Sequence, residues 1–358
     1  MNNNQQNKNR HTRQGNIELL RFIFSLCIVL HHAMLDDMPM GGGWLSVEFF
    51  FLLNGVFLGR TIKKQGNKNN FQEIMRSDAQ YLKRRIRSIF PFFFLATIIG
   101  FAVNVYVFSL SINLELILKL INDFFFLQSF GMPLISATGV VWYLSSMFFA
   151  LWVLYPIASK WYSAFTYYVT PIMAMFCMGI MIHTYGTLNV PNEFLFGIIC
   201  TGFMRSFSMI GLGFLCNECS DKIANKLSDD RGVLITIIEC ALYCFIIWYM
   251  HIWTVAMGGF DELIVFSMFL ALSISLSGKS KISEMADNPI SRTLGEYSVS
   301  LFLSHFYWVQ YISQIASKLN IDVTNIGYVG LLLSFITAGI VMAAGKFIQR
   351  IWNKRFGF

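Results

Sequence analysis

Charged side chains are scarce in this chain. Only 13% of its 358 residues are Asp, Glu, Lys or Arg, whereas 55% are hydrophobic. Ordinary soluble domains carry about 25% charged residues, so this scarcity excludes a chain that folds mainly in water. A membrane span uses about 20 apolar residues. Spans therefore occupy most of the chain and leave no room for a large extramembrane catalytic domain.

Several sequence signatures are also missing. The apolar runs do not alternate apolar and polar residues as the strands of a transmembrane β-barrel do. No small-residue cleavage site follows the first run, which favours an uncleaved signal anchor over a signal peptide. The seven cysteines imply no disulfide framework, since they lie in apolar runs or at their predicted cytoplasmic ends. Cys216 and Cys219 form a CxxC with neither a second pair nor a nearby His, so we expect no metal site.

What the chain does contain is a series of long apolar runs, which predict an all-α polytopic transmembrane bundle of about ten spans. The predicted spans are Ile17–Leu35, Trp44–Gly59, Ile89–Phe108, Thr138–Ile157, Phe165–His183, Phe194–Cys216, Val233–Trp253, Leu263–Ser277, Leu294–Ile315 and Gly327–Ile348. With the N-terminus inside, 23 of the 27 Lys and Arg fall on the cytoplasmic side. The positive-inside rule then places both termini in the cytoplasm, and the net charge of +7 needs no nucleic acid to explain it.

The domain organisation follows from these spans. We expect one transmembrane domain, residues 17–350, between a disordered polar tail (1–16, with His11) and a short basic tail (351–358). A basic cytoplasmic loop covers residues 60–88, and an external amphipathic or partly embedded segment covers residues 111–136. A rival count of eleven spans would make residues 113–130 a span, but it would place eleven later basic residues outside.

Function is expected in the few polar residues inside the apolar runs, because the membrane makes them costly. Arg21 and His32 lie eleven residues apart, which on a helix is within roughly 20° of one face and about 16 Å along the axis. On this arrangement Arg21 would bind an anionic group and His32 would transfer a proton deeper in the membrane. The alternative is that Arg21 extends to the lipid phosphates and both histidines lie in the outer headgroup zone. Glu48 has His32 as its nearest partner in sequence and would set the tautomer of the imidazole, unless it faces water. Whether His31 shares the role of His32 is left open.

Further polar residues suggest binding of a phosphorylated molecule. The segment Lys83–Arg87 holds four cations just before the third run, and such a cluster attracts either lipid headgroups or a phosphorylated donor. Arg84 and Arg87, three residues apart on a helix, suit a bidentate grip on a diphosphate. Arg205, in the sixth run, either lines the cavity and holds a phosphate or pairs with Glu239.

These residues together resemble the acyltransferase-3 family of integral membrane acyltransferases. The motifs that carry the resemblance are Arg21 with ten residues before His32, Gly41–Phe50 followed by Asn54-Gly55, Arg84-x-x-Arg87, Leu127-Gln128 with Val141–Ser145, and Leu294–Ser298 with His305. The resemblance implies an enzyme of the cell membrane that moves an acyl group, commonly acetyl, from cytoplasmic acyl-CoA to a hydroxyl of an extracytoplasmic glycan or lipid-linked sugar. Acyl-CoA is then the donor substrate, and membrane lipids are further partners.

The expected site residues fall into three groups. They are His32, Glu48 and Arg21 for catalysis, Arg84, Arg87, Arg85, Lys83 and Arg205 for the donor, and Asn54, Trp142 and His305 for the acceptor. By similarity His32 is the catalytic histidine, and it either deprotonates the acceptor hydroxyl or carries the acyl group itself. Arg21 or Asn54 would stabilise the oxyanion. Asn54 stands where the family usually has serine, and Asn can still donate and accept hydrogen bonds.

Three alternatives concern the role of the whole chain. Some members of the family carry an extra esterase-like domain, which this chain lacks, so we expect it to act alone or with a separate extracytoplasmic transferase partner. A polytopic bundle with buried Arg, Glu and His also suits a transporter or flippase of a lipid-linked sugar. The remaining alternative is an inactive family member that scaffolds glycan synthesis.

Overall fold

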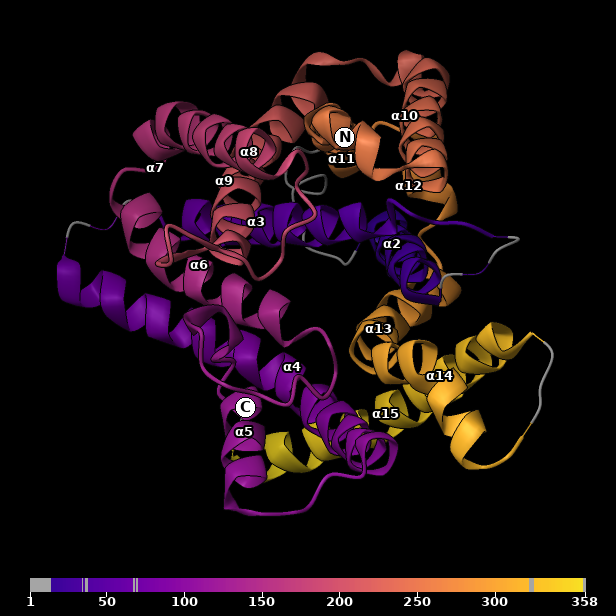
Figure 1. The fold of residues 1–358 in the computed structure, drawn as a ribbon. Helices are drawn as coiled ribbons and strands as arrows, with labels where there is room; N and C mark the ends of the chain where they lie inside the picture. The colour runs from indigo at the N-terminus through magenta and orange to yellow at the C-terminus, as the bar shows by residue number, and fades with distance from the viewer. Residues whose placement is uncertain are drawn as a thin grey trace.

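The computed structural model describes residues 14–33, 35, 38–66, 68, 70–321 and 325–356, without the side chains of residues 229, 355 and 356. The described chain is almost entirely helical (Figure 1). The α-helices are α2 (Gly15–Ala33), α3 (Ser46–Gln65), α4 (Phe71–Phe108), α5 (Leu114–Phe124), α6 (Val141–Lys160), α7 (Tyr162–Ala164), α8 (Thr170–Tyr185), α9 (Thr201–Lys226), α10 (Gly232–Ile252), α11 (Asp261–Ser277), α12 (Lys281–Met285), α13 (Pro289–Ser304), α14 (Phe306–Lys318) and α15 (Ile326–Phe356).

Shorter elements connect the helices. The 3-10 helices are η1 (Gly43–Leu45), η2 (Gln128–Phe130), η4 (Asp229–Arg231) and η5 (Val255–Phe260), and η3 (Phe165–Val169) is a π-helix. Strands β1 (Phe194–Leu195) and β2 (Ile199–Cys200) form a small antiparallel hairpin. His11 and residues 1–13 of the predicted polar tail lie outside the described residues. Helix α2 begins at Gly15, two residues before the predicted span, and the side chain of Asn16 donates to Ser275 O and Ser283 Oγ at 3.0 Å.

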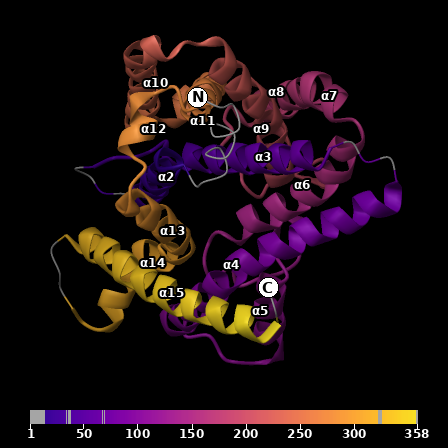
Figure 2. The same ribbon diagram turned by 180° about the vertical axis from the view of Figure 1, so that it is seen from behind.

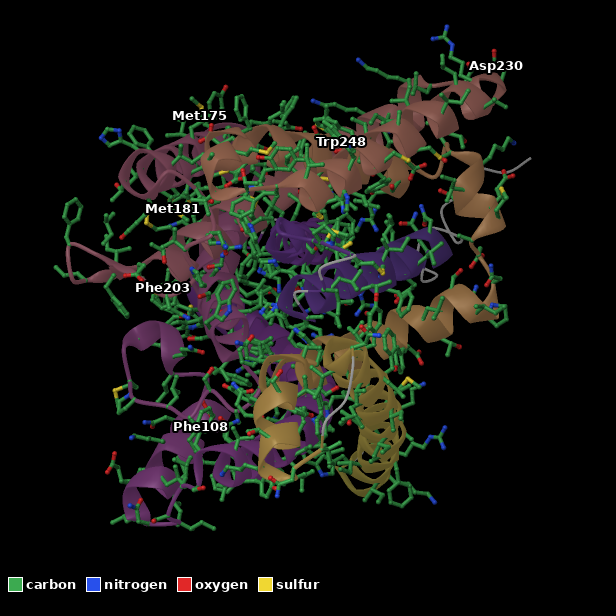
Figure 3. All side chains as sticks on the ribbon, turned by 45° about the vertical axis from the view of Figure 1, so that its right-hand side comes forward. Phe108, Met175, Met181, Phe203, Asp230 and Trp248 are labelled. Carbon is green, nitrogen blue, oxygen red and sulfur yellow. The ribbon has the colours of Figure 1, made fainter. Side chains whose placement is uncertain are left out.

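Eight helical segments within the described residues are long and apolar enough to cross a membrane, so the chain is a multi-pass membrane protein. They are Gly15–Ala33, Gly43–Gln65, Phe71–Phe108, Val141–Lys160, Tyr162–Tyr185, Gly232–Ile252, Val255–Ser277 and Ile326–Lys354. Each overlaps one of the ten predicted spans, although Phe71–Phe108 begins 18 residues before the predicted start at Ile89 and includes residues 71–88 of the predicted basic loop. Apolar side chains on the outside of the bundle, such as Met175 on α8 and Trp248 on α10, are exposed as lipid-facing groups would be (Figure 3).

The remaining two predicted spans differ from the structure in ways that have local causes. The run predicted to begin at Phe194 first forms the β1–β2 hairpin, and helix α9 begins only at Thr201. The run Leu294–Ile315 is divided at His305 into α13 and α14. With 16 and 13 residues, neither of these two helices is long enough to span a bilayer alone.

Side-chain caps and glycines set several helix boundaries. Asn70, Asn113 and Asn288 begin α4, α5 and α13, and each side chain accepts a backbone N–H from the first turn of its helix. Gly186 and Gly278 end α8 and α11 in the left-handed conformation that favours glycine. The helices therefore start and stop where the sequence supplies these signals.

Helix α3 lies in the middle of the bundle in both ribbon views (Figures 1 and 2). It crosses α9 at very close range, because a Cβ atom on Gly55 would lie 2.0 Å from Ile210 O and one on Gly213 would lie 2.3 Å from Leu52 O. Only glycine permits such a backbone approach. Gly55 therefore serves close packing of α3 against α9.

Helix α15 packs against α4, which it crosses, on one side of the bundle (Figure 2). Its Gly345 faces the ring of Phe92, which would lie 2.4 Å from a Cβ atom at that position. Helix α5, with 11 residues, is too short to span a bilayer. It folds back along α4, since the ring of Phe124 packs on Phe90 and Phe94 at centroid distances of 6.4 and 5.4 Å.

Candidate active site

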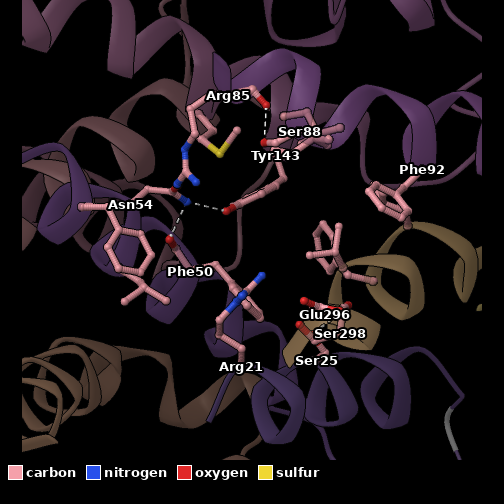
Figure 4. Close-up of a pocket in the computed structure, with 18 of the residues that line it drawn as sticks. Arg21, Ser25, Phe50, Asn54, Arg85, Ser88, Phe92, Tyr143, Glu296 and Ser298 are labelled. Carbon is pink, nitrogen blue, oxygen red and sulfur yellow. Dashed lines mark hydrogen bonds between the residues drawn. The ribbon is translucent and has the colours of Figure 1, made fainter. Parts of the chain in front are cut away.

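A cavity of about 480 Å³ lies inside the bundle and is called the inner cavity here. Helices α2, α3, α4, α6, α13 and α15 all contribute to its wall. The lining side chains include Arg21, Ser25, Phe50, Asn54, Arg85, Ser88, Phe92, Tyr143, Glu296 and Ser298, which Figure 4 labels, together with Glu18, Phe302, Lys346 and Gln349. Two guanidinium groups and an ammonium group thus face a largely apolar chamber.

Four charged groups of the inner cavity form two ion pairs. Arg21 Nη1 lies 2.7 Å from Glu18 Oε2, one turn back on α2. Lys346 Nζ on α15 lies 2.5 Å from Glu296 Oε2 on α13. Burial in an apolar environment makes an isolated charge costly, so these pairs keep polar groups in the cavity at an acceptable cost. The second pair also fastens α15 to α13.

Asn54 on α3 connects two other lining residues. Its Oδ1 accepts a hydrogen bond from Arg85 Nη2, and its Nδ2 donates to the hydroxyl of Tyr143 at 3.0 Å and to Phe50 O at 2.8 Å (Figure 4). Arg85 Nε is buried and has no hydrogen-bond partner among the described residues. Asn54 therefore holds the Arg85 guanidinium against the cavity wall, and because both ends of its amide are occupied, it is not free to stabilise an oxyanion.

A second hollow of about 620 Å³, called the outer hollow, lies between α4 and α15. Arg84 and Arg87 line it, as their helical spacing predicts, together with Ile86, Ser88, Phe90, Gln349, Trp352 and Asn353. Ser88 and Gln349 line both hollows, so the two adjoin. The predicted donor residues are thus divided: Arg85 faces the inner cavity, Arg84 and Arg87 face the outer hollow, and Lys83 lines neither.

Three histidines form a cluster near one end of α2. The ring centroid of His32 lies 5.0 Å from that of His31 and 5.2 Å from that of His305, at the junction of α13 and α14. The ring of Phe306 packs against His32 at 5.2 Å. This histidine cluster joins residues 273 positions apart in the chain, and the sequence alone could not bring them together.

Backbone carbonyls orient these rings. Nδ1 of His32 lies 3.2 Å from Ile28 O, Nδ1 of His305 lies 2.9 Å from Phe302 O, and Nδ1 of His31 lies 3.1 Å from Met40 O. A carbonyl oxygen only accepts, so the hydrogen of each neutral ring is on Nδ1 and the lone pair is on Nε2. Nε2 of His305 is buried without a partner among the described residues. Each imidazole thus presents a basic nitrogen away from its backbone partner.

The histidine cluster adjoins the inner cavity through aromatic rings. Phe302 lines the cavity, and its ring centroid lies 6.2 Å from that of His305 and 6.0 Å from that of Phe50. Arg21, which also lines the cavity, lies on α2 with His32, eleven residues and about 16 Å away along the axis. The helix therefore extends from the charged cavity to the histidine cluster, as its spacing predicts.

The predicted partnership of Glu48 with His32 is wrong. Glu48 Oε1 lies 2.6 Å from both Nε and Nη2 of Arg205, and both side chains are buried. The guanidinium carbon lies 5.3 Å from the Trp44 ring and 5.0 Å from the Trp142 ring, within range of cation–π attraction. The pair forms because the close α3–α9 crossing places the first turns of these helices together.

The predicted partnership of Arg205 with Glu239 is wrong for the same reason. Glu239 Oε1 accepts a hydrogen bond from Ser275 Oγ on α11. Arg205 lines neither hollow, so the structure does not bring it to Arg84 and Arg87 as a phosphate ligand. Trp142 likewise contacts Arg205 and lines neither hollow. Among the described residues, no group of three or more His, Cys, Asp or Glu side chains is arranged to hold a metal ion.

Several residues of the site have no strong sequence signal. Lys346, Gln349 and Trp352 lie on α15, beyond the last motif of the resemblance, and look like ordinary polar or interfacial residues in the sequence. Glu18 could have been paired with Arg21 from their spacing of three residues on a helix. Tyr143 belongs to a motif but had no assigned role.

Comparison with known protein families identifies the family of nearly the whole chain. A family model described as an acyltransferase domain matches residues 14–345, nearly the whole chain. The match includes α2, from which Arg21 and His32 come. It also includes every lining residue of the two hollows except those on α15, which are Lys346, Gln349, Trp352 and Asn353. No curated protein and no solved structure matches the chain significantly.

Proposed function

The chain belongs to the acyltransferase-3 family, and from this premise we propose which groups this membrane acyltransferase transfers. We propose that it takes an acyl group, acetyl by preference, from cytoplasmic acyl-CoA and places it on a hydroxyl of an extracytoplasmic glycan or lipid-linked sugar, in the cell membrane. The observation that carries the proposal is the pair of adjoining hollows that extends from Arg84 and Arg87 to the ring of Phe302, which lies beside His305 of the histidine cluster.

The proposed orientation follows from the distribution of charge. With 23 of 27 basic residues on the side of the N-terminus, the outer hollow faces the cytoplasm, where acyl-CoA is found. The C-terminal end of α2, which carries the histidine cluster, is then toward the extracytoplasmic end. Donor and acceptor approach from opposite sides and meet near His32.

The proposed division of labour follows from distance. Arg21 and His32 are about 16 Å apart along α2. When His32 deprotonates the acceptor hydroxyl, the oxyanion that forms on the acyl carbonyl is therefore out of hydrogen-bond range of Arg21. We therefore assign Arg21 and Arg85 to the donor arm in the inner cavity. Nε2 of His32 accepts the proton of the acceptor hydroxyl and returns it to the sulfur of the departing CoA thiolate. Glu48 supports the fold near the site and does not orient His32.

The test is acyl transfer from labelled acetyl-CoA in membranes that contain the wild-type protein or the His32→Ala variant. The loss of a general base lowers the rate by about 10²- to 10⁴-fold. His183→Ala, at an exposed position on α8, is the matched control and retains the wild-type rate. Undiminished transfer by His32→Ala would contradict the assignment, and absence of CoA binding by the wild type would favour a transporter.

A further inference from the structure

The α15 side of the outer hollow has no role in the mechanism above. Trp352 and Asn353 line this side, opposite Arg84 and Arg87 of α4. The hollow thus combines a flat aromatic ring, an amide and two guanidinium groups within about 620 Å³. Simple attraction of phosphate would need only the cations, so the aromatic ring calls for a separate explanation.

The ring of Trp352 is held in a defined position. It stacks on Phe90 with a centroid distance of 6.3 Å and an interplanar angle of 17°. Phe90 is in turn supported by Phe94 at 6.1 Å and by Phe124 of α5 at 6.4 Å. Four rings from three helices thus form a continuous aromatic wall beside the hollow. A preformed flat surface of this kind suits a planar aromatic ligand, because little side-chain entropy is lost on binding.

The spacing along α15 explains why Trp352 faces α4. Gly345, Gln349 and Trp352 lie four and three residues apart, and so share one face of the helix. Gly345 permits α15 to approach Phe92 closely, and Gln349 Nε2 donates to Ser88 O at 2.8 Å. Helix α15 is therefore fixed to α4 at two successive turns, and Trp352 follows at the next turn.

The outer hollow adjoins the inner cavity at Ser88 and Gln349, which line both and are joined by the hydrogen bond from Gln349 Nε2 to Ser88 O. A ligand that occupies both has a polar, planar head outside and a slender arm inside. A phospholipid has no planar aromatic group, and its acyl chains belong in the bilayer, so the aromatic wall and the adjacent inner cavity favour a nucleotide with an arm.

We propose that the outer hollow is a nucleotide site, in which a purine base stacks on Trp352, the Asn353 amide contacts the polar edge of the base, and Arg84 and Arg87 hold the phosphates. The inference rests on the proposed function, because the nucleotide is that of acyl-CoA. It assigns recognition of the base to α15, a helix to which no motif of the resemblance extends.

The first test measures binding of coenzyme A, and of its nucleotide half alone, to the purified protein by calorimetry. Trp352→Ala weakens both roughly tenfold, because stacking of one base contributes about 1–3 kcal/mol. Trp352→Phe retains a flat ring and restores most of the affinity. Trp248→Ala removes an exposed Trp from α10, far from this hollow in sequence, and leaves the affinity unchanged.

The second test compares acetyl-CoA with S-acetyl-pantetheine, a donor that lacks the nucleotide. Trp352→Ala raises the KM for acetyl-CoA roughly tenfold and leaves the KM for S-acetyl-pantetheine unchanged. Equal losses with both donors would show a structural role for Trp352 and overturn the inference. The calorimetry is then repeated in bilayers with and without phosphatidylglycerol, to detect a lipid site. If Trp352→Ala lowered the affinity for coenzyme A only when the anionic lipid is present, this result would also overturn the inference.

The failure of this inference is distinguishable from the failure of the proposed function. If the wild-type protein binds and uses acetyl-CoA, and the Trp352→Ala variant binds coenzyme A equally well, only the nucleotide site is refuted. If the wild-type protein neither binds nor uses acetyl-CoA, the proposed donor itself is refuted.

Discussion

Glu48 Oε1 lies 2.6 Å from both Nε and Nη2 of Arg205, so the buried carboxylate of α3 is neutralised by a guanidinium of α9. The ion pair acts with the glycine crossing at Gly55 and Gly213 to hold these two helices together. His32, which was expected to use this carboxylate, is oriented instead by Ile28 O of its own helix. The proposed catalytic base thus needs no acidic partner to fix its tautomer.

We expect Glu48→Gln and Arg205→Gln each to lower the stability of the protein, because either change leaves the other charge buried and unmatched. Breaking such a pair costs about 3–5 kcal/mol. The double variant has no buried charge, so its loss is smaller than the sum of the two single losses, with a coupling of about 0.5–3 kcal/mol. Thermal melting of the four proteins in one detergent measures the coupling. Strictly additive losses would contradict the pairing.

The helices were predictable from the sequence because each apolar run carries its own signal, and eight of the ten runs became helical segments long and apolar enough to cross a membrane. The pairing of buried polar groups was not predictable from the sequence, because it depends on contacts between distant segments. Glu48 is 16 positions from His32 but 157 from Arg205, and only the helix crossing made the more distant residue its partner. Similarly, spacing predicted Arg21 and His32 on one helix, but nothing local placed His305 beside His32.

Asn54→Leu should weaken use of the donor. The substitution keeps the volume but removes the acceptor of Arg85 and the donor to Tyr143, so the guanidinium is no longer held at the wall of the inner cavity. A hydrogen bond to a charged group contributes about 1.5–3 kcal/mol, and we expect the KM for acetyl-CoA to rise roughly tenfold with a smaller change in kcat. Asn54→Ser, which keeps a donor and an acceptor, has a milder effect. An unchanged KM in Asn54→Leu would refute this role of Asn54.

Asp123 gives the segment after α5 a predictable pH dependence. Burial raises the pKa of this carboxyl to about 6, although the N–H groups of Ser136 and Ala137 donate to its two oxygens and oppose the rise. The pKa in an unfolded chain is about 3.9. Because the folded value is the higher one, the group stabilises the fold fully below about pH 4 and this contribution is lost as the pH rises through about 6.

The variant Asp123→Asn does not titrate and supplies the reference for that measurement. We expect the melting temperature of the wild type, relative to the variant, to fall between about pH 4 and about pH 6 and to stay level above it. Melting curves at a series of pH values check the direction. A relative melting temperature that rises over this interval would mean that the folded protein favours the carboxylate.

Gly139 determines where Phe306 packs against His32, and this relationship can be tested with a matched pair of glycines. At Gly139 φ is +68°, and a Cβ atom would lie 2.2 Å from Cγ of Phe306. At Gly131, in the same connection, φ is +74°, but the nearest atom to a Cβ is 3.4 Å away, on Phe194. An Ala at either position adopts a left-handed conformation at a cost of about 1–2 kcal/mol, but only Gly139→Ala must move a ring.

The ring of Phe306 is 5.2 Å from the His32 ring, so its displacement changes the packing around the base without touching either hollow. We therefore expect Gly139→Ala to lower kcat roughly tenfold or more while coenzyme A binding stays at the wild-type level, since small misplacements at a reacting centre are costly. Gly131→Ala loses a similar amount of stability but retains its kcat. Rates are compared per folded protein, as measured by gel filtration in detergent. If both variants lose kcat by the same factor, the effect belongs to the connection as a whole, and Phe306 has no specific part in positioning His32.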